Sequence, residues 1–166
     1  MDTPRSGRFG VGTCLLAASL AALRSAPLSR AIYYAANIAA APAGGNAVSV
    51  AFSQAAVLVD PRITEYSGMR TSALFDAGTS ASGSGTTASS GALATAAPSE
   101  LLLAASMTGA TFTAPGAGFT SRVVTAPDDD LVADAPAPTA GSYTATASLS
   151  SGTWLLQLAA FAGQGP

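Results

Sequence analysis

The strongest candidates for catalytic residues in this sequence are carboxylates. Glu65 lies two residues from Ile63 in the run DPRITEYSG, and Asp60 or Asp76 would be the second acid of a pair. A glycosidase needs two carboxyl groups about 5–9 Å apart, and a sequence cannot supply that distance. We expect instead that Glu65 forms a structural ion pair with one of three arginines, Arg62, Arg70 or Arg122.

The composition removes most other catalytic groups. The chain has no histidine, which excludes the commonest general base and any Ser-His-Asp arrangement. All seven basic residues are arginine, so Schiff-base and Ser-Lys chemistry are excluded as well. The single cysteine, Cys14, has no histidine to activate it and cannot form an intrachain disulfide. Gly83 and Gly85 lack the lysine and helix that follow in a phosphate-binding loop. We therefore predict that the chain is not an enzyme.

One acidic stretch is a candidate cation site. Calcium takes 6–8 oxygen ligands, and sandwich modules outside the cell often use such a site to fix a loop. The stretch lacks the glycine and the spacing of an EF-hand loop, so a solvated acidic turn is the alternative that we favour. The four candidate ligands are Asp128, Asp129, Asp130 and Asp134, and no other cofactor is expected.

Five aromatic residues are candidates for a platform on which a sugar ring would stack. Aromatic side chains on alternating strands more often belong to the core, and we favour that interpretation. The five are Tyr33, Tyr34, Tyr66, Tyr143 and Trp154.

The overall charge argues against nucleic acid as a partner. The 166 residues carry a net charge of −2, and only 10% of them are charged. This composition offers no basic stripe for phosphates. A surface kept soluble by Ser and Thr hydroxyls suits a β-rich protein, although a GC-rich coding sequence would also enrich Ala, Gly, Arg and Pro. The length is that of one domain with a real core.

The N-terminal segment, residues 1–27, is typical of an export signal. Arg5 and Arg8 precede the apolar run Val11–Leu23, and small residues follow it up to Ala26. The run is too short for a transmembrane span, which needs about 20 apolar residues. The alternative is a short helix, Leu15–Leu23, that is retained in the protein. We expect a domain at residues 28–162 and a tail at residues 163–166.

Hydrophobic alternation predicts strands along the domain. In Ala47–Gly68, two such runs with a short connection predict an antiparallel pair, with a bulge or an edge at Asp60-Pro61. Ser142–Leu149 is the cleanest amphipathic strand, and Thr153–Ala162 is predicted to be buried on both faces. Low-complexity Ala77–Ser90 is expected to be a loop that leads into an edge strand. Further strands are predicted around Ile32–Tyr34 and at Gly91–Ala97, Leu101–Met107, Phe119–Thr125 and Leu131–Ala133, with Leu74 and Phe75 under the sheet and a Pro/Ala loop at Ala135–Gly141.

About eight short strands with turn signals every 8–12 residues describe an all-β antiparallel sandwich, of jelly-roll or Ig-like type. The segments AIYYAANIAA, VSVAFSQAA, DPRITEYSGM, SELLLAA, GFTSRV and AGSYTATASLSSGTWLLQLAAF occur in that order. In this order they resemble an uncharacterised β-sandwich module of large exported and cell-surface proteins of environmental bacteria. The resemblance covers residues 28–162. It implies secretion and repeated surface modules, and it supplies no catalytic motif.

The chain departs from that module at its start, where two or three further strands would precede Ile32–Tyr34. Either an export signal is joined to a shortened domain, or the chain is a fragment or has a misplaced start. A sandwich without those strands would expose strand edges, and we expect self-association through them.

The function expected from the sequence is that of a non-catalytic extracellular or cell-surface module, structural or adhesive, with glycan as a candidate ligand. Its partners would be surface glycans or other surface modules. The alternative is an ancillary domain or fragment of a carbohydrate-active enzyme that uses Glu65.

Overall fold

The computed structural model describes residues 17–19, 23–25, 28–42, 45, 47–52, 55, 59–127 and 129–164, and these residues form strands and connections without a helix. No described segment is therefore a helix of the length and apolarity that crossing a membrane requires. The strands are β1 (Ala17–Ser19), β2 (Leu23–Ser25), β3 (Leu28–Arg30), β4 (Tyr33–Ala35), β5 (Phe75–Thr95), β6 (Glu100–Thr108), β7 (Phe112–Pro115), β8 (Thr120–Thr125), β9 (Asp130–Ala137) and β10 (Gly141–Ala162).

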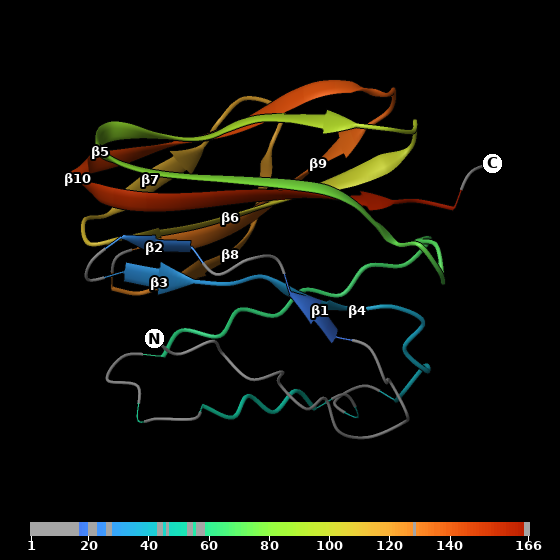
Figure 1. Ribbon diagram of the computed structural model, residues 1–166. Helices are drawn as coiled ribbons and strands as arrows, with labels where there is room; N and C mark the ends of the chain where they lie inside the picture. The colour runs from blue at the N-terminus through green and yellow to red at the C-terminus, as the bar shows by residue number, and fades with distance from the viewer. Residues whose placement is uncertain are drawn as a thin grey trace.

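One antiparallel sheet of six strands dominates the molecule, which confirms the predicted all-β antiparallel class. The strand order is β5-β10-β6-β9-β8, and β7 pairs with the first part of β10. Two small pairs, β1 with β4 and β2 with β3, lie outside this sheet. Figure 1 shows both pairs beneath it, in the blue part of the chain.

The sheet folds over because its two longest strands bend together. The β5–β10 register shifts between Ser148 and Gly152, and β5 has a positive φ of 133° at Gly85 opposite the same point. Figure 1 shows β5 and β10 doubling back together at one end of the molecule. One layer contains residues 141–149 of β10 with β7, and the other contains residues 152–162 with β6, β9 and β8.

The main core fills the space between the two layers. Ala145, Ala147 and Leu149 of the first layer belong to one cluster with Leu156 and Leu158 of the second. Odd-numbered residues of β10 face the core before the register shift, and even-numbered residues face it afterwards. The irregular pairing at residues 149–151 exchanges the two faces of the strand. The predicted amphipathic pattern of Ser142–Leu149 is confirmed, and Trp154–Ala162 is buried on both faces as predicted.

A second apolar cluster lies on the opposite face of the lower layer. Ile32 packs there with Phe161, and Leu74 and Phe75 lie against them, as the sequence predicted. The rings of Tyr34 and Phe75 stack with centroids 5.8 Å apart, and Tyr34 meets Phe161 edge-on at 5.3 Å. The N-terminal part of the chain thereby closes a face that the sheet alone would leave exposed.

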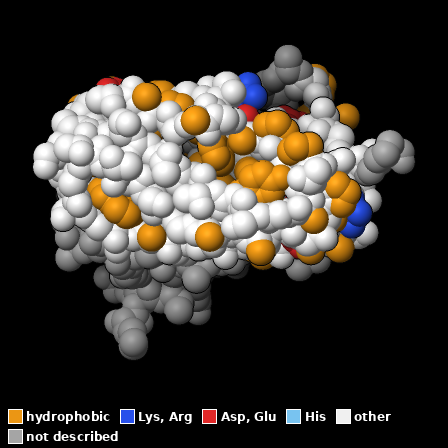
Figure 2. Space-filling view, turned by 90° about the horizontal axis from the view of Figure 1, so that it is seen from above, with side chains coloured by type: hydrophobic (Ala, Val, Ile, Leu, Met, Phe, Trp, Pro, Cys, Tyr) orange, Lys and Arg blue, Asp and Glu red, His pale blue; other side chains and the backbone are white. Residues whose placement is uncertain are grey.

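The outer face of the upper layer carries few charged side chains, as Figure 2 shows. Ser142, Thr144 and Ser148 of β10 are exposed on it beside Ala92 and Ala94 of β5. Hydroxyls and small apolar groups therefore make up this surface, as the composition indicated.

The expectation of a loop at Ala77–Ser90 was wrong, because this stretch is part of β5. Its Ser, Gly and Ala residues have low strand propensity, but β5 pairs with β10 from Phe75 to Thr95 and small residues fit the bend and the close layers. Gly83 lies directly under the indole of Trp154, and a Cβ at this position would be 2.6 Å from Cζ2. The position of β5 at an edge of the sheet does agree with the prediction.

The predicted strand pair at Ala47–Gly68 is not formed by its described residues. Val48 makes a single bridge, and the stretch from Val59 to Ser67 has no strand pairing. The alternation is present, but the polar set faces the protein: Arg62 and Tyr66 are partly buried, while Ile63 is 59% exposed. The reason is the polar face of β9, which this stretch covers.

Two smaller predictions also differ from the structure. Strand β9 continues through Pro136 to Ala137, where a loop was expected. Pro136 lies beyond the end of the β8–β9 pairing, so its missing N–H leaves no gap in that ladder.

The alternative of a helix over Leu15–Leu23 is wrong for the described residues of this segment, because Ala17–Ser19 and Leu23–Ser25 are strands. Cys14 lies outside the described residues.

Candidate functional site

Strand β9 carries two buried aspartates that interact with polar side chains from other segments. In the sequence DLVAD, Leu131 and Ala133 point into the main core, so Asp130 and Asp134 point to the opposite face of the sheet. Both aspartates are buried. A buried carboxylate needs partners, and the stretch from Asp60 to Tyr66 provides them.

Asp130 anchors the first of two polar clusters. Its Oδ1 accepts a 2.8 Å hydrogen bond from the Thr108 N–H, and its Oδ2 lies 3.5 Å from Arg62 Nη2. Arg62 also donates to the Ser106 carbonyl at 2.9 Å and contacts Asp60 at 3.1 Å through Nε. The side chains of Arg62 and Asp130 are only 6% and 2% exposed. This arrangement is a buried structural ion cluster.

Arg30 joins the same cluster from β3. Its Nη1 donates to the Ser106 carbonyl that also accepts from Arg62. Burial and, to a smaller extent, the neighbouring charge of Arg62 lower the pKa of Arg30 to about 9, against the opposing effect of Asp130 and Asp60. The cluster therefore tethers the N-terminal part of the chain to β6.

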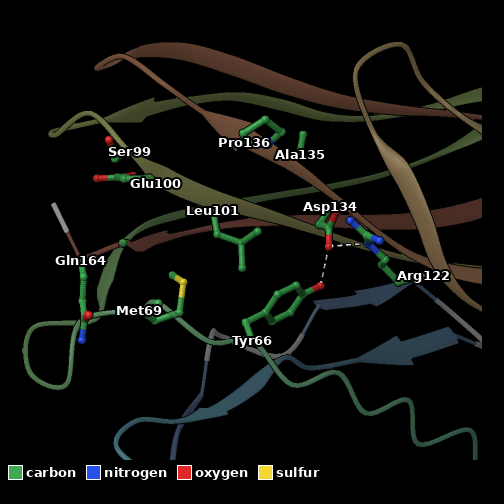
Figure 3. Close-up of a pocket in the computed structure, with 12 residues that line it drawn as sticks. Tyr66, Met69, Ser99, Glu100, Leu101, Arg122, Asp134, Ala135, Pro136 and Gln164 are labelled. Carbon is green, nitrogen blue, oxygen red and sulfur yellow. Dashed lines mark hydrogen bonds and ion pairs between the residues drawn. The ribbon is translucent and has the colours of Figure 1, made fainter. Parts of the chain in front are cut away.

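Asp134 organises the second cluster, which reaches the surface. Its Oδ2 accepts a 2.8 Å hydrogen bond from the Tyr66 hydroxyl and a 2.7 Å hydrogen bond from Arg122 Nε. The Arg122 side chain is 51% exposed, whereas that of Asp134 is 5% exposed. Figure 3 shows Tyr66 and Arg122 approaching the carboxylate from different sides.

Two groups of this second cluster, Tyr66 and Arg122, keep their protons at neutral pH. Burial, together with the hydrogen bond to Asp134, raises the pKa of Tyr66 to about 12, so the phenol keeps its proton. The hydrogen bond and the charge of Asp134 raise the pKa of Arg122, which stays a cation. Tyr66 is thus a hydrogen-bond donor to Asp134.

An open pocket of about 370 Å³ adjoins Asp134, and we call it the Tyr66 pocket. It lies where the start of β6 and the end of β9 meet two other segments, the Tyr66–Met69 stretch and the C-terminal Gly163–Gln164. Two backbone hydrogen bonds fix its rim, from Gly163 N to Ser99 O at 3.0 Å and from Gln164 N to Gly68 O at 2.7 Å. Its lining residues are Tyr66, Gly68, Met69, Ser99, Glu100, Leu101, Arg122, Asp134, Ala135, Pro136, Gly163 and Gln164.

Glu100 is an unusual member of this lining. It is 4% exposed, and neither carboxylate oxygen meets a donor at normal hydrogen-bond geometry in the described part of the chain. Burial raises the pKa of Glu100, and the nearby carboxylate of Asp76 raises it further. Asp76 itself accepts a 2.8 Å hydrogen bond from the Ala96 N–H, in the turn before β6.

The candidate acid Glu65 is exposed and does not line the Tyr66 pocket. Its proposed partner acids lie in two different places, because Asp60 belongs to the Asp130 cluster and Asp76 lies beside Glu100. The structure therefore places Glu65 outside the Tyr66 pocket.

The four candidate calcium ligands are separated or already engaged. Asp128 lies outside the described residues, and Asp129 occupies a turn with a positive φ of 51°. Asp130 and Asp134 each contact an arginine and lie four residues apart on one strand, about 13 Å. Within the described ranges, no three acidic, His or Cys side chains form a group that would hold a metal ion.

The five candidate aromatic residues do not form one platform. Tyr34 packs in the second apolar cluster and Trp154 in the main core. Tyr143 donates a 2.7 Å hydrogen bond to the Thr139 carbonyl, and Tyr33 is a partly buried residue of β4. Tyr66 is the member of this set that lines the pocket.

The sequence did hold one unused signal for this site. Arg62 and Tyr66 are four residues apart, as are Asp130 and Asp134, and the two pairs contact each other in order. The residues that sequence reasoning missed are Arg122 as a pocket residue, Met69 and Gln164, which come from separate segments.

Together the fold and the site define a class: an antiparallel sandwich-like β domain with a polar pocket at the edge of one layer. Comparison with known proteins adds no narrower identity, since no protein-family model matches the chain. No curated protein and no solved structure matches it either.

Proposed function

We propose that this chain is a non-catalytic exported module, structural or adhesive in role, that binds glycan in the Tyr66 pocket. The observation that carries the proposal is the Arg122–Asp134 pair at the pocket wall, with Nε and Oδ2 2.7 Å apart. A paired cation and carboxylate offer donors and acceptors side by side, which suits the adjacent hydroxyls of a sugar.

The rest of the lining supports the same ligand class. Met69, Leu101 and Pro136 offer apolar surface to the C–H face of a sugar ring, and the Gln164 amide adds a polar group at the rim. A volume of about 370 Å³ lies in the lower part of the range for small-molecule sites, about 300–1,000 Å³. Small-molecule sites are also usually lined by apolar side chains with a small number of polar groups among them.

The charge balance favours a neutral sugar over an acidic one. Arg122 and Asp134 compensate each other, and Glu100 is the remaining acid in the lining. An anionic ligand would find no excess positive charge there. The low overall charge of the chain points the same way.

A non-catalytic role is supported by the pairing of the buried charged side chains with one another. Arg62 and Asp130 are buried against each other, and Asp134 is occupied by Tyr66 and Arg122. These groups position the Asp60–Tyr66 stretch on the sheet. Residues 1–27 have the sequence pattern of an export signal, which favours a location outside the cell or on its surface, although β1 and β2 within them pair with β4 and β3.

The experiment is a panel of soluble neutral and acidic polysaccharides, followed by titration calorimetry with the best binder. We expect neutral glycans to bind and Arg122→Ala to weaken binding about tenfold or more, because a hydrogen bond from a charged group contributes about 1.5–3 kcal/mol. Arg70→Ala, an exposed arginine outside the lining, is the matched control and should bind normally. Equal binding by both variants would refute the proposal, as would hydrolysis of the glycan that Glu65→Gln abolishes.

A further inference from the structure

Strand β5 forms one edge of the six-stranded sheet, and it is longer and less charged than an edge strand usually is. It has 21 residues, and its outer side pairs with no other strand among the described residues. From Ala77 to Thr95 it contains neither a charged residue nor a proline. Natural edge strands are usually short, charged, interrupted by proline or covered.

The opposite edge shows the contrast. Strand β8 has six residues and carries Arg122, and Thr125 at its end donates a 2.7 Å hydrogen bond to Asp60 of the covering stretch. One edge of the sheet is thus short, charged and covered, and the other is long and uncharged.

The two halves of β5 differ as well. The half after the bend has a register shift at Ser90-Gly91, where Gly91 has a φ of 75°, and the Ser90 carbonyl accepts a hydrogen bond from the Thr79 hydroxyl. A bulge of this kind disrupts pairing with a further strand. The half from Ala77 to Gly85 pairs with β10 without a shift, so its outer edge is regular.

We propose that the regular half of β5, residues 77–85, is an interaction surface for a second copy of this chain, joined by antiparallel β5–β5 pairing. A two-fold axis beside Ala81 pairs Ser80 with Ser82 and Gly78 with Ser84 of the other copy. This half of β5 exposes three small serine side chains and a glycine, so opposed strands meet without a clash; these residues are Gly78, Ser80, Ser82 and Ser84.

Charge also permits this pairing of identical strands. The one charged residue of β5 is Asp76, and in this arrangement each Asp76 lies opposite Thr86 of the other copy. The two carboxylates are then about ten residues apart along the strands, roughly 33 Å, and are screened from each other. The pairing joins two sheets into one continuous sheet and satisfies the outward backbone groups of both edges.

The association is weak for a single pair of chains, because about nine residues of edge bury less surface than a standard stable interface of about 1,200–2,000 Å². Repeated modules on one surface would strengthen it through effective concentration. The proposal is independent of glycan binding, since the Tyr66 pocket involves no residue of β5.

The test is sedimentation equilibrium of the full chain from low to high micromolar concentration, with circular dichroism to verify the fold. We expect a reversible monomer–dimer equilibrium that Ser82→Lys abolishes, because an added lysine is a natural protection of an edge. Thr144→Lys, an exposed hydroxyl position of β10 outside the proposed interface, is the matched control and should dimerise like the parent. A protein that is monomeric at every concentration would refute the proposal, as would a dimer unaffected by Ser82→Lys.

A second measurement covers the case in which Ser82→Lys perturbs folding. In a Cys14→Ser background, mixed Ser80→Cys and Ser82→Cys chains should form an intermolecular disulfide faster than either chain alone. Residues directly opposite in an antiparallel pair have Cα atoms about 4.5–5.5 Å apart, within reach of a disulfide. Equal rates in the mixture and in the separate chains would contradict the proposed pairing.

Discussion

Nη2 of Arg62 lies 3.5 Å from Oδ2 of Asp130, and both side chains are almost completely buried. Four residues further along each segment, Tyr66 donates to Asp134 at 2.8 Å. These two contacts hold the Asp60–Tyr66 stretch in register on β9 without strand hydrogen bonds. The first contact stabilises the arrangement, and the second forms part of the wall of the Tyr66 pocket.

Removal of the Asp130 carboxylate should therefore destabilise the fold. We expect Asp130→Ala to lower the free energy of unfolding by about 3–5 kcal/mol, because it removes the buried carboxylate that faces Arg62 and accepts from the Thr108 N–H. Urea unfolding measures the change. The exposed variant Arg70→Ala should stay within about 0.5 kcal/mol of the parent; a similar loss in both variants would contradict a specific role for the buried pair.

The contact between Gly83 and Trp154 allows a test of the layer packing. A Cβ at Gly83 would be 2.6 Å from the indole, so Gly83→Ala should cost about 1–3 kcal/mol through overpacking. Near-ultraviolet circular dichroism of Trp154 should change as well. Ser84→Ala, at the exposed neighbouring position, should leave both the stability and the tryptophan signal unchanged. An unchanged Gly83→Ala protein would mean that β5 does not lie against the indole.

Glu100 should make stability depend on pH. Because its pKa is higher in the folded protein than its ordinary value of 4.5, the folded state binds the proton more tightly than the unfolded state. Its contribution is fully present below pH 4.5 and is lost as pH rises through the folded-state pKa. We expect Glu100→Gln to be more stable than the parent at pH 7 and less dependent on pH above 4.5. Parallel pH profiles of unfolding for parent and variant would contradict this account.

Tyr66 should make the stability of the fold depend on pH at the alkaline end of the range. Its folded-state pKa of about 12 exceeds the ordinary value of 10, so its contribution is complete below pH 10 and is lost as pH rises toward 12. At pH 7, Tyr66→Phe should cost about 1.5–3 kcal/mol, the usual contribution of a hydrogen bond to a charged group. Urea unfolding measures this loss, and Tyr33→Phe, a tyrosine outside the pocket, is the control. Equal losses in both would argue against the Asp134 contact.

The sequence predicted the fold best where local alternation and burial agree. Tyr143, Ala145, Ala147 and Leu149 repeat every second residue, and they do line the core. The stretch from Asp60 to Tyr66 also alternates, but its polar set and not its apolar set faces the protein. Which face is buried depends on two aspartates about seventy residues away on β9, and no local pattern reveals them.

Strand β5 and the pocket were missed for related reasons. The composition of Ala77–Ser90 is typical of a linker, and only its pairing with β10 makes it a strand. The pocket is assembled from five separate segments, so residues such as Arg122 and Gln164 have no sequence signal in common. The prediction that Glu65 would form an ion pair rather than catalyse remains a prediction.

The most direct test of the proposed function is a map of where a glycan binds. Titration of isotope-labelled protein with the best neutral glycan, followed by amide chemical shifts, locates the site residue by residue. We predict the largest shifts around the pocket, at Gly68, Met69, Leu101, Ala135 and Gly163. Shifts confined to the hydroxyl-rich face of β10, at Ser142, Thr144 and Ser148, would contradict the account and move the site to the outer face of the upper layer.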